Sequence, residues 1–340
     1  MSKSTVASAG PAASDRGAFE PEQLEPEQLE LHRRELTGYC YRMLGSFAEA
    51  EDAVQETMIR AWKARDGFEG RSSVRTWLHR VATNVCIDML RGSKRRALPM
   101  GLVPSTTTAQ VTDMGPQLGE STWVLPAPDA RVLSDHADPA QLIAQRDTVR
   151  LAFLAALQHL PPRQRAVLLL REVLDWSAAE VAQLLGGSVA SVNSALQRAR
   201  ATLAAREPEA SRSAADDGSH GELLAEYMDA FERYDVQRLT ALLHEDAVQA
   251  MPPYPLWLRG AAEIGRWMLG PGAECRGSRM LPAGAANAAA AFGQYRADGR
   301  GGHQPFALHV VRAEGDRIAE IHSYLMPELL FPLFGLPAVP

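Results

Sequence analysis

The sequence predicts a multidomain chain in which two all-α domains, a helical bundle and a helix-turn-helix, are followed by an α+β domain. Three observations lead to this fold class. Apolar residues recur at intervals of three and four through 31–96 and 141–206, as in amphipathic helices. Two stretches without periodicity, 97–140 and 207–220, read as linkers. Residues 221–340 open with a helical pattern and continue in short strand-like segments flanked by DG and EGD turns.

Residues 1–30 are rich in Ala, Ser, Pro and Glu and contain the near-repeat EPEQLEPEQLE, which predicts a disordered tail ending in the start of a helix. No apolar run approaches the roughly 18 residues that span a bilayer, and the N-terminus lacks a secretory signal pattern, so we expect no membrane partner. The three cysteines, Cys40, Cys86 and Cys275, are too few and too scattered for a disulfide framework or a four-ligand zinc site. We therefore expect a cytoplasmic protein without metal or cofactor.

The charge distribution is more informative than the net charge of −6, which does not indicate a nucleic-acid-binding protein. Taken as 1–30, 31–96, 97–220 and 221–340, the segments carry net charges of −4, +5, −3 and −4, and the positive charge of 31–96 peaks at Arg91, Lys94, Arg95 and Arg96. A local cluster of this kind is suited to contacting phosphates.

The second helical segment has the layout of a helix-turn-helix. Ser177 stands at an N-cap position with Glu180 three residues on, and a helix over 178–185 is followed by the turn glycines Gly186-Gly187. Ser188 then caps a second helix with an apolar inner face at Val189, Val192, Ala195, Leu196 and Ala199. Small polar residues at the start of such a helix allow close entry into the major groove, and arginines further along meet phosphates. The alternative is a plain helical hairpin. The predicted DNA-facing residues are Ser188, Ala190, Ser191, Asn193, Ser194, Gln197, Arg198 and Arg200.

The stretches AEDAVQETMIRAW and FEGRSSVRTWLHRVATNVCIDMLRGSKRR resemble region 2 of a bacterial sigma-70 factor of the extracytoplasmic-function group. The helix-turn-helix segment, 141–206, is similar to region 4 of the same group, and 97–140 takes the place of region 3. The resemblance implies a sigma factor that binds core RNA polymerase through its β and β′ subunits and directs promoter-specific transcription initiation, without enzymatic activity.

Asp52, Gln55 and Glu56 lie on one helical face, at i, i+3 and i+4. By resemblance this face contacts the clamp helices of the β′ subunit; a solvated charged face is the alternative. Phe68 and Trp77 flank the stretch that, by resemblance, captures a base flipped from the −10 element. Core packing is the alternative for both and is favoured for Trp77.

The following helix and its end carry the residues that, by resemblance, read and clamp the −10 element: Asn84, Asp88, Arg91, Lys94, Arg95 and Arg96. The family commonly has Arg where this chain has Thr83, which removes one expected phosphate contact. Asp88 is equally interpreted as an intrahelical partner of Arg91.

Residues 221–340 resemble a SnoaL-like domain, an α+β cone, which one subset of these sigma factors carries at the C-terminus. The segments that carry the resemblance are LLAEYMDAFERYDVQRLTALLHEDAV, MPPYPLWLRGAAEIGRWM and the terminal strands. The resemblance implies regulation of the sigma factor in cis, with a small-molecule ligand as a further expectation. Candidate pocket residues are Trp257, Trp267, His309, His322 and Tyr324; we assign no catalytic residue, since both histidines are also typical of barrel packing.

The apolar segment 325–337 either packs on the cone or docks onto the sigma domains. Two other functions compete with the sigma factor. One is a helix-turn-helix regulator fused to a small-molecule-binding or cyclase-like domain, and the other is a cyclase-type enzyme with a DNA-binding front end.

Overall fold

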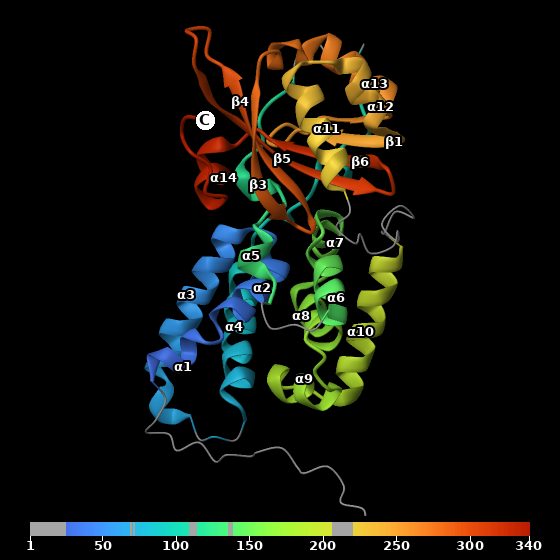
Figure 1. The fold of residues 1–340 in the computed structure, drawn as a ribbon. Helices are drawn as coiled ribbons and strands as arrows, with labels where there is room; N and C mark the ends of the chain where they lie inside the picture. The colour runs from blue at the N-terminus through green and yellow to red at the C-terminus, as the bar shows by residue number, and fades with distance from the viewer. Residues whose placement is uncertain (1–24, 69, 71, 109–113, 135–138, 206–219) are drawn as a thin grey trace, which may run out of the picture.

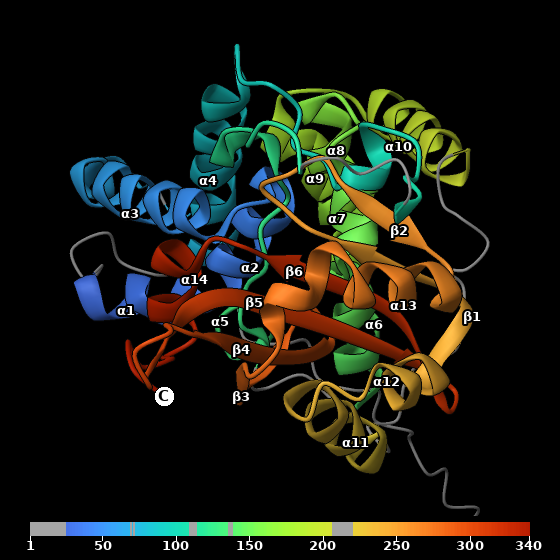
Figure 2. The same cartoon turned by 90° about the horizontal axis from the view of Figure 1, so that it is seen from above.

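The computed structural model describes residues 25–68, 70, 72–108, 114–134, 139–205 and 220–340. Two helical units stand side by side beneath an α+β domain (Figure 1), whose sheet extends over both of them when seen from above (Figure 2). The fold class predicted from the sequence is confirmed. Among the described helices none is long and apolar enough to cross a membrane. Most of the predicted N-terminal tail lies outside the described residues.

The first helical unit is a small bundle whose helix ends follow from local sequence. Ser46 and Ser73 accept hydrogen bonds from the third backbone N–H of the helices they precede, and Gly45, with φ +74°, ends the helix before the first of these. The core contains Leu36, Tyr39 and other apolar side chains of the predicted faces. The elements are α1 (Pro26–Glu30), α2 (Arg33–Leu44), α3 (Phe47–Lys63), the 3₁₀ turn η2 (Arg65–Gly67) and α4 (Val74–Leu90).

The second helical unit contains the predicted helix-turn-helix. The capping box of Ser177 and Glu180 is present, and Gly186 adopts the left-handed conformation (φ +62°) that the tight turn requires. Val189, expected on the inner face of the last helix, is instead 45% exposed. The elements are α6 (Pro139–Val149), α7 (Leu151–Leu157), α8 (Pro162–Leu168), the π-helical turn η6 (Leu169–Val173), α9 (Ala178–Leu185) and α10 (Val189–Ala204).

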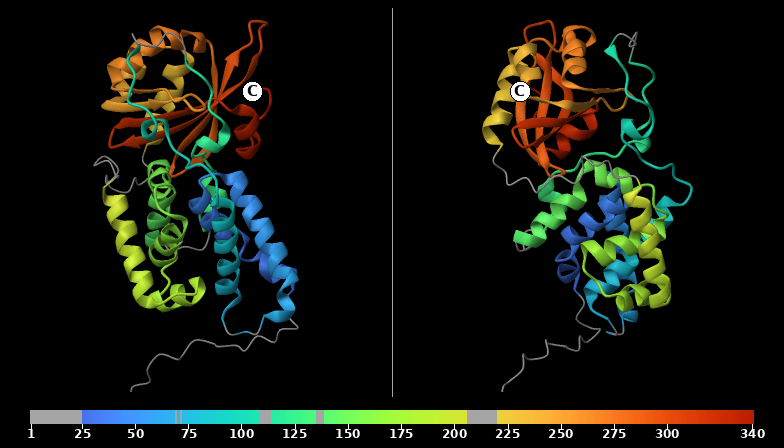
Figure 3. Two further views of the ribbon diagram at one scale, coloured as in Figure 1. Left: turned by 180° about the vertical axis from the view of Figure 1, so that it is seen from behind. Right: turned by 90° about the vertical axis from the view of Figure 1, so that its right-hand side faces the viewer.

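The described part of the segment between the two units, residues 97–108 and 114–134, is packed against the protein. We call it the connector. Trp123 and Val124 are fully buried in the core that the two helical units share. Ala97 and Val124 are joined by a backbone hydrogen bond of 3.0 Å. The connector passes along the C-terminal domain (Figure 3) and contains η3 (Pro99–Gly101), η5 (Glu120–Thr122) and α5 (Asp129–Val132).

The C-terminal domain is a six-stranded sheet in the order β2-β1-β6-β5-β4-β3, antiparallel except between β1 and β6. The predicted strand segments AFGQYRA, PFALHVVRA and RIAEIHSYL lie in β4, β5 and β6. The elements are α11 (Gly221–Glu232), α12 (Val236–Leu242), β1 (Leu243–Ala250), β2 (Trp257–Arg259), α13 (Ala261–Leu269), η8 (Pro271–Cys275), β3 (Arg279–Ala286), β4 (Ala289–Ala297), β5 (His303–Glu314), β6 (Arg317–Tyr324) and α14 (Pro327–Leu333).

Alternate residues of each strand point to opposite faces of the sheet, and each face packs against other parts of the chain. Its inner face packs with α11, α12 and α13 in a core of its own. Its outer face continues the core of the helical units, through residues such as Leu308, Val310 and Tyr324. The predicted apolar tail forms α14 and packs mainly on this sheet: Phe331 contacts Tyr295, with ring centroids 5.1 Å apart. Packing on the cone is therefore the reading that the structure supports for 325–337.

The five candidate pocket residues do not line one pocket, and this prediction is wrong. Trp257 and Tyr324 donate to carbonyl oxygens of the connector at 2.9 and 3.1 Å. Trp267 and His309 face the inner side of the sheet, whereas His322 faces the second helical unit. The sequence pattern assigned each residue to a strand or helix, but it did not determine on which face of the sheet the side chain lies.

His309 is bonded within the packed interior of the domain. Its Nε2 lies 2.8 Å from Gln294 Oε1 and its Nδ1 lies 3.2 Å from the hydroxyl of Tyr227. Burial lowers the pKa of His309 to about 4, so the ring is neutral at neutral pH. With both ring nitrogens engaged, His309 stabilises the cone interior.

Candidate nucleic-acid interface

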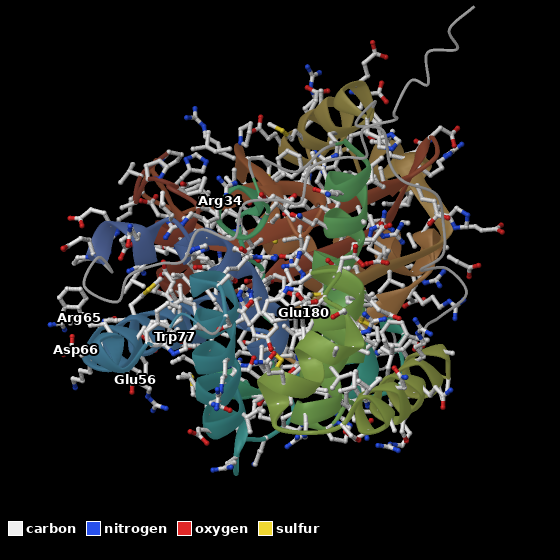
Figure 4. All side chains as sticks on the ribbon, turned by 90° about the horizontal axis from the view of Figure 1, so that it is seen from below. Arg34, Glu56, Arg65, Asp66, Trp77 and Glu180 are labelled. Atoms are coloured by element: carbon white, nitrogen blue, oxygen red, sulfur yellow. The ribbon has the colours of Figure 1, made fainter. Side chains whose placement is uncertain are left out.

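The predicted polymerase face lies on α3 and is accessible. Asp52 and Gln55 are exposed and Glu56 is half-buried. Glu56 accepts a hydrogen bond from Arg60 at 2.6 Å, and Arg60 also lies 3.8 Å from Asp88 on α4. One arginine thus connects the predicted polymerase face to the predicted DNA face. Figure 4 shows Glu56, Arg65, Asp66 and Trp77 gathered at one end of the first unit, with Glu180 on α9 across from them.

Phe68 and Trp77 pack against each other, with ring centroids 5.0 Å apart. Phe68 is the more buried of the two, at 6% exposure, while Trp77 is half-buried. In this conformation Phe68 belongs to the core and Trp77 covers it. Residues 69 and 71, in the stretch between them, lie outside the described part of the chain.

Most of the predicted DNA-facing residues of α4 and its end are exposed, and one is buried. Asn84 is exposed. Asp88 forms an ion pair with Arg91 at 2.9 Å, which is the alternative interpretation of Asp88 that the sequence offered. Lys94 and Arg95 are exposed, and Arg95 reaches His159 of the second unit at 3.0 Å. These groups remain available to contact nucleic acid.

Arg96 is a correction to the predicted phosphate clamp. Its side chain is 6% exposed and its Nη2 lies 2.6 Å from Glu49 Oε1. Its Nη1 donates to the carbonyl oxygens of Glu120 and Trp123 at 3.0 and 2.8 Å. A guanidinium with three internal partners fixes the connector onto α3 and is not accessible to phosphate. A basic run in the sequence does not reveal which member turns inward.

Thr83, where the family commonly has Arg, is fully buried. Its hydroxyl donates to the carbonyl oxygen of His79 at 2.6 Å and contacts the Tyr39 hydroxyl at 2.8 Å. Thr83 therefore joins α2 to α4 instead of reaching DNA.

The outer face of α10 is accessible over its whole length: Ser194 is half-buried and the other predicted DNA-facing residues are exposed. Ser188 and Ser191 form a capping box with bonds of 3.1 Å, so their hydroxyls already support the helix start. Arg198 donates to Ser194 at 2.6 Å, and Arg200 pairs with Glu172 at 2.5 Å. The face thus presents Asn193, Gln197 and Arg198 on a well-capped helix.

Two buried arginines, which sequence reasoning missed, hold the helical units together. Arg165 of α8 is 3% exposed and donates to the carbonyl oxygen of Met43, in the last turn of α2. Arg42 of α2 donates to Thr148 Oγ1 at 3.0 Å and to the carbonyl oxygen of Gln145 at 3.4 Å, both on α6. Burial lowers the pKa of each guanidinium to about 10, so both stay charged at neutral pH.

The same seam contains a stack of rings. The Arg75 guanidinium lies 5.7 Å from the ring centroid of Trp176 and pairs with Glu35 at 2.6 Å. His79 lies between Trp176 and Tyr39, with ring centroids 5.3 and 5.4 Å away. Its Nε2 is buried without a hydrogen-bond partner, and burial lowers the pKa of His79 to about 4.

Acidification is therefore expected to destabilise the seam. The ordinary pKa of histidine, 6.5, applies to the unfolded chain, so the unfolded state takes up the proton first. The stability contributed by neutral His79 is complete above pH 6.5 and is lost as the pH falls towards 4, by about 3 kcal/mol. Urea unfolding at several pH values should show a smaller loss for His79→Asn, whose amide keeps a donor for the Arg75 carbonyl. Equal losses in the two proteins would contradict this role.

The turn between β3 and β4 joins the C-terminal domain to both helical units. Asn287 is 2% exposed, and its Nδ2 donates to the Tyr41 hydroxyl of α2 at 2.7 Å and to the carbonyl oxygen of Val149 in α6 at 2.6 Å. Its Oδ1 accepts from the backbone N–H of Ala127 in the connector at 2.9 Å. We call this set of four residues the Asn287 junction.

The next residue adds a second bond to the connector. The backbone N–H of Ala288 donates to the carboxylate of Asp129 at 3.1 and 3.2 Å. Asn287 and Ala288 both have positive φ, 55° and 59°, which gives the two-residue turn its tight reversal. One hairpin tip thus contacts three separate parts of the chain.

Comparison with known families identifies each part. Residues 29–96 match Sigma-70 region 2, residues 150–203 match Sigma-70, region 4, and residues 224–321 match the SnoaL-like domain. Over 312 residues the chain is 47% identical to the ECF RNA polymerase sigma factor SigG of Mycobacterium tuberculosis H37Rv, which covers 90% of this chain and 82% of SigG. The chain belongs to the extracytoplasmic function (ECF) RNA polymerase sigma factors. Its first helical unit contains region 2, its second contains region 4, and its function is transcription initiation.

A second ECF relative agrees in sequence and in fold. The ECF sigma factor SigJ of M. tuberculosis H37Rv is 30% identical over 244 residues, which cover 70% of each chain. The crystal structure of M. tuberculosis SigJ superposes with a TM-score of 0.58 at 23% identity, covering 92% of this chain and all of SigJ. The three-part fold is therefore shared with another ECF sigma factor.

Proposed function

We propose that the C-terminal domain regulates this ECF sigma factor in cis by holding regions 2 and 4 and the connector in one closed arrangement. The Asn287 junction is the observation that carries this proposal, because a single buried amide of the C-terminal domain bonds to all three. The arginines Arg42 and Arg165 support the same arrangement from within the helical units.

The closed arrangement conflicts with simultaneous binding of two promoter elements. Elements named for positions −10 and −35 are about 25 base pairs apart, or roughly 85 Å along B-DNA at 3.4 Å per base pair. Regions 2 and 4 share one continuous core in this structure. A segment the length of 97–140, fully extended, spans about 150 Å at 3.3–3.6 Å per residue. Release of the connector would therefore allow both elements to be reached.

We assign the exposed faces to the partners of a sigma factor. In this proposal Asp52, Gln55 and Glu56 meet the β′ clamp helices and region 4 meets the β subunit. Asn84 reads bases of the −10 element, while Arg91, Lys94 and Arg95 contact its phosphates. Asn193, Gln197 and Arg198 read and contact the −35 element. Each assignment rests on exposure, charge and helix placement.

Regulation in cis is tested by reconstitution with sigma-free core polymerase and a promoter carrying both elements. The full-length chain and residues 1–206 should each support initiation, with more transcript from 1–206 because regions 2 and 4 are no longer held by the C-terminal domain. Equal transcription and equal polymerase affinity for the two proteins would exclude regulation in cis. No transcript from either would exclude the assigned promoter contacts.

The polymerase face is tested by reversing one charge. Asp52→Lys should weaken core polymerase binding at least tenfold while changing stability by less than about 0.5 kcal/mol, because the side chain is exposed. Asp316→Lys is the matched control, since Asp316 is a 93% exposed side chain at the distant β5–β6 turn. Fluorescence titration with core polymerase measures both. The assignment would be wrong if the two variants bound alike.

A further inference from the structure

A cavity of about 280 Å³ lies where the connector, region 4 and the C-terminal domain meet. Asp129 of the connector and Arg146, Asp147 and Arg150 of the second helical unit form one side. The first turn of α11 and the ends of β3, β4 and β5 form the other side. The cavity lies outside the packed interior of the cone and borders the Asn287 junction through Asp129 and Ala288. Its size is near the lower end of small-molecule pockets, about 300–1,000 Å³.

The polar wall of this cavity offers guanidinium donors beside the start of a helix. Arg150 pairs with Asp147 at 3.1 Å through Nη2, while its Nε is buried without a hydrogen-bond partner. Arg146 is exposed at the cavity edge. The N-terminal turn of α11 adds the positive end of a 12-residue helix. The carboxylates of Asp129 and Asp147 offset the two arginines, which disfavours a ligand with two or more negative charges.

The remaining wall is aliphatic. Ile143, Leu224 and Val311 contribute branched side chains, and the sheet side is made of small residues that leave the space open: Gly284, Ala285, Ala288, Ala289, Ala290 and Ala313. Among the described lining residues there is no Phe, Tyr or Trp, and the imidazole of His220, at the start of α11, is the ring that reaches the cavity. An unbranched hydrocarbon chain matches this surface better than a planar ring system, which binds most strongly to aromatic faces.

We propose that this cavity binds a medium-chain aliphatic monocarboxylate. The carboxylate accepts hydrogen bonds from Arg150 and Arg146 near the start of α11, and the hydrocarbon chain lies over the alanine surface. A ligand in this position contacts the connector, region 4 and the C-terminal domain at once, so it stabilises the closed arrangement. That regulatory consequence rests on the proposed regulation in cis, whereas binding itself does not.

Binding is tested by calorimetric titration of octanoate into the full-length protein without polymerase. Octanoate should bind, and octan-1-ol, which lacks the charge, should bind at least tenfold more weakly. Arg146→Gln and Ala285→Phe, which remove a charge and fill the cavity from an exposed strand position, should each weaken octanoate at least tenfold. Arg300→Gln, an exposed arginine in the distant β4–β5 turn, should leave affinity within twofold.

The proposal is overturned if octanoate does not bind, if octan-1-ol binds equally, or if inorganic phosphate competes as well as octanoate does. It is also overturned if Arg300→Gln has the effect of Arg146→Gln. A negative binding result leaves regulation in cis to be decided by transcription of 1–206. Binding without any difference between full-length protein and 1–206 would instead retain the site and exclude its regulatory consequence.

Discussion

Asn287→Asp is expected to separate the C-terminal domain from both sigma regions and to raise transcription from a promoter that requires both elements. The substitution removes both N–H donors of Asn287 Nδ2 and places a carboxylate against the Val149 carbonyl oxygen, in a site that is 2% exposed. The new carboxylate would also face the hydroxyl of Tyr41. That hydroxyl already donates its proton to the Leu125 carbonyl oxygen at 2.7 Å, so it has no second proton to donate to the carboxylate. A buried charge without a partner costs several kcal/mol. A loss of about 3 kcal/mol shifts the closed–open equilibrium roughly 100-fold.

The matched control is Ala288→Gly. Ala288 has φ +59°, and glycine adopts this conformation without strain, so the control keeps the turn and the Ala288 N–H bond to Asp129. Hydrogen exchange across 127–132 of the connector should increase for Asn287→Asp and remain at the wild-type level for Ala288→Gly. Wild-type exchange and wild-type transcription for Asn287→Asp would show that the junction does not hold the closed state.

Local capping and turn chemistry made the helix-turn-helix predictable from sequence. Ser177, Glu180, Gly186 and Ser188 each have a role that depends on residues no more than four positions away. The three strand segments of the C-terminal domain were predictable for the same reason, because alternation and turns are local.

The contacts between domains depend on distant residues and could not be predicted in this way. Arg96 belongs to a basic run, and only its contacts with Glu49 and the connector show that it is buried. Asn287 is surrounded by alanines in the sequence, and asparagine favours turns. Its three bonding partners, however, lie up to 246 positions away in the sequence. The pocket candidates failed because assigning a strand does not fix which sheet face a side chain takes when both faces are buried.

Arg165→Met is expected to weaken the contact between regions 2 and 4 directly. The guanidinium donates to the Met43 carbonyl oxygen at the C-terminal end of α2, to Gln158 Oε1 at 2.7 Å and to the Leu160 carbonyl oxygen at 3.2 Å. Methionine fills a similar volume but leaves these buried acceptors without donors, at about 1–3 kcal/mol each. Removal of the desolvated charge offsets part of this cost, so we expect a net loss of about 2–4 kcal/mol.

The control for this substitution stands two residues away on the same helix. Arg163 donates to the Leu185 carbonyl oxygen at 2.6 Å, and both residues belong to region 4. Arg163→Met should therefore leave the seam between regions 2 and 4 intact. Small-angle scattering should show a larger radius of gyration for Arg165→Met than for Arg163→Met, and the transcript yield should rise in the same order. Arg165 and Asn287 share no bonding partner, although Met43 and Tyr41 both belong to α2. A double variant that opens no further than either single variant would therefore mean that both contacts hold one cooperative closed state. Additive opening would mean that regions 2 and 4 separate independently of the C-terminal domain.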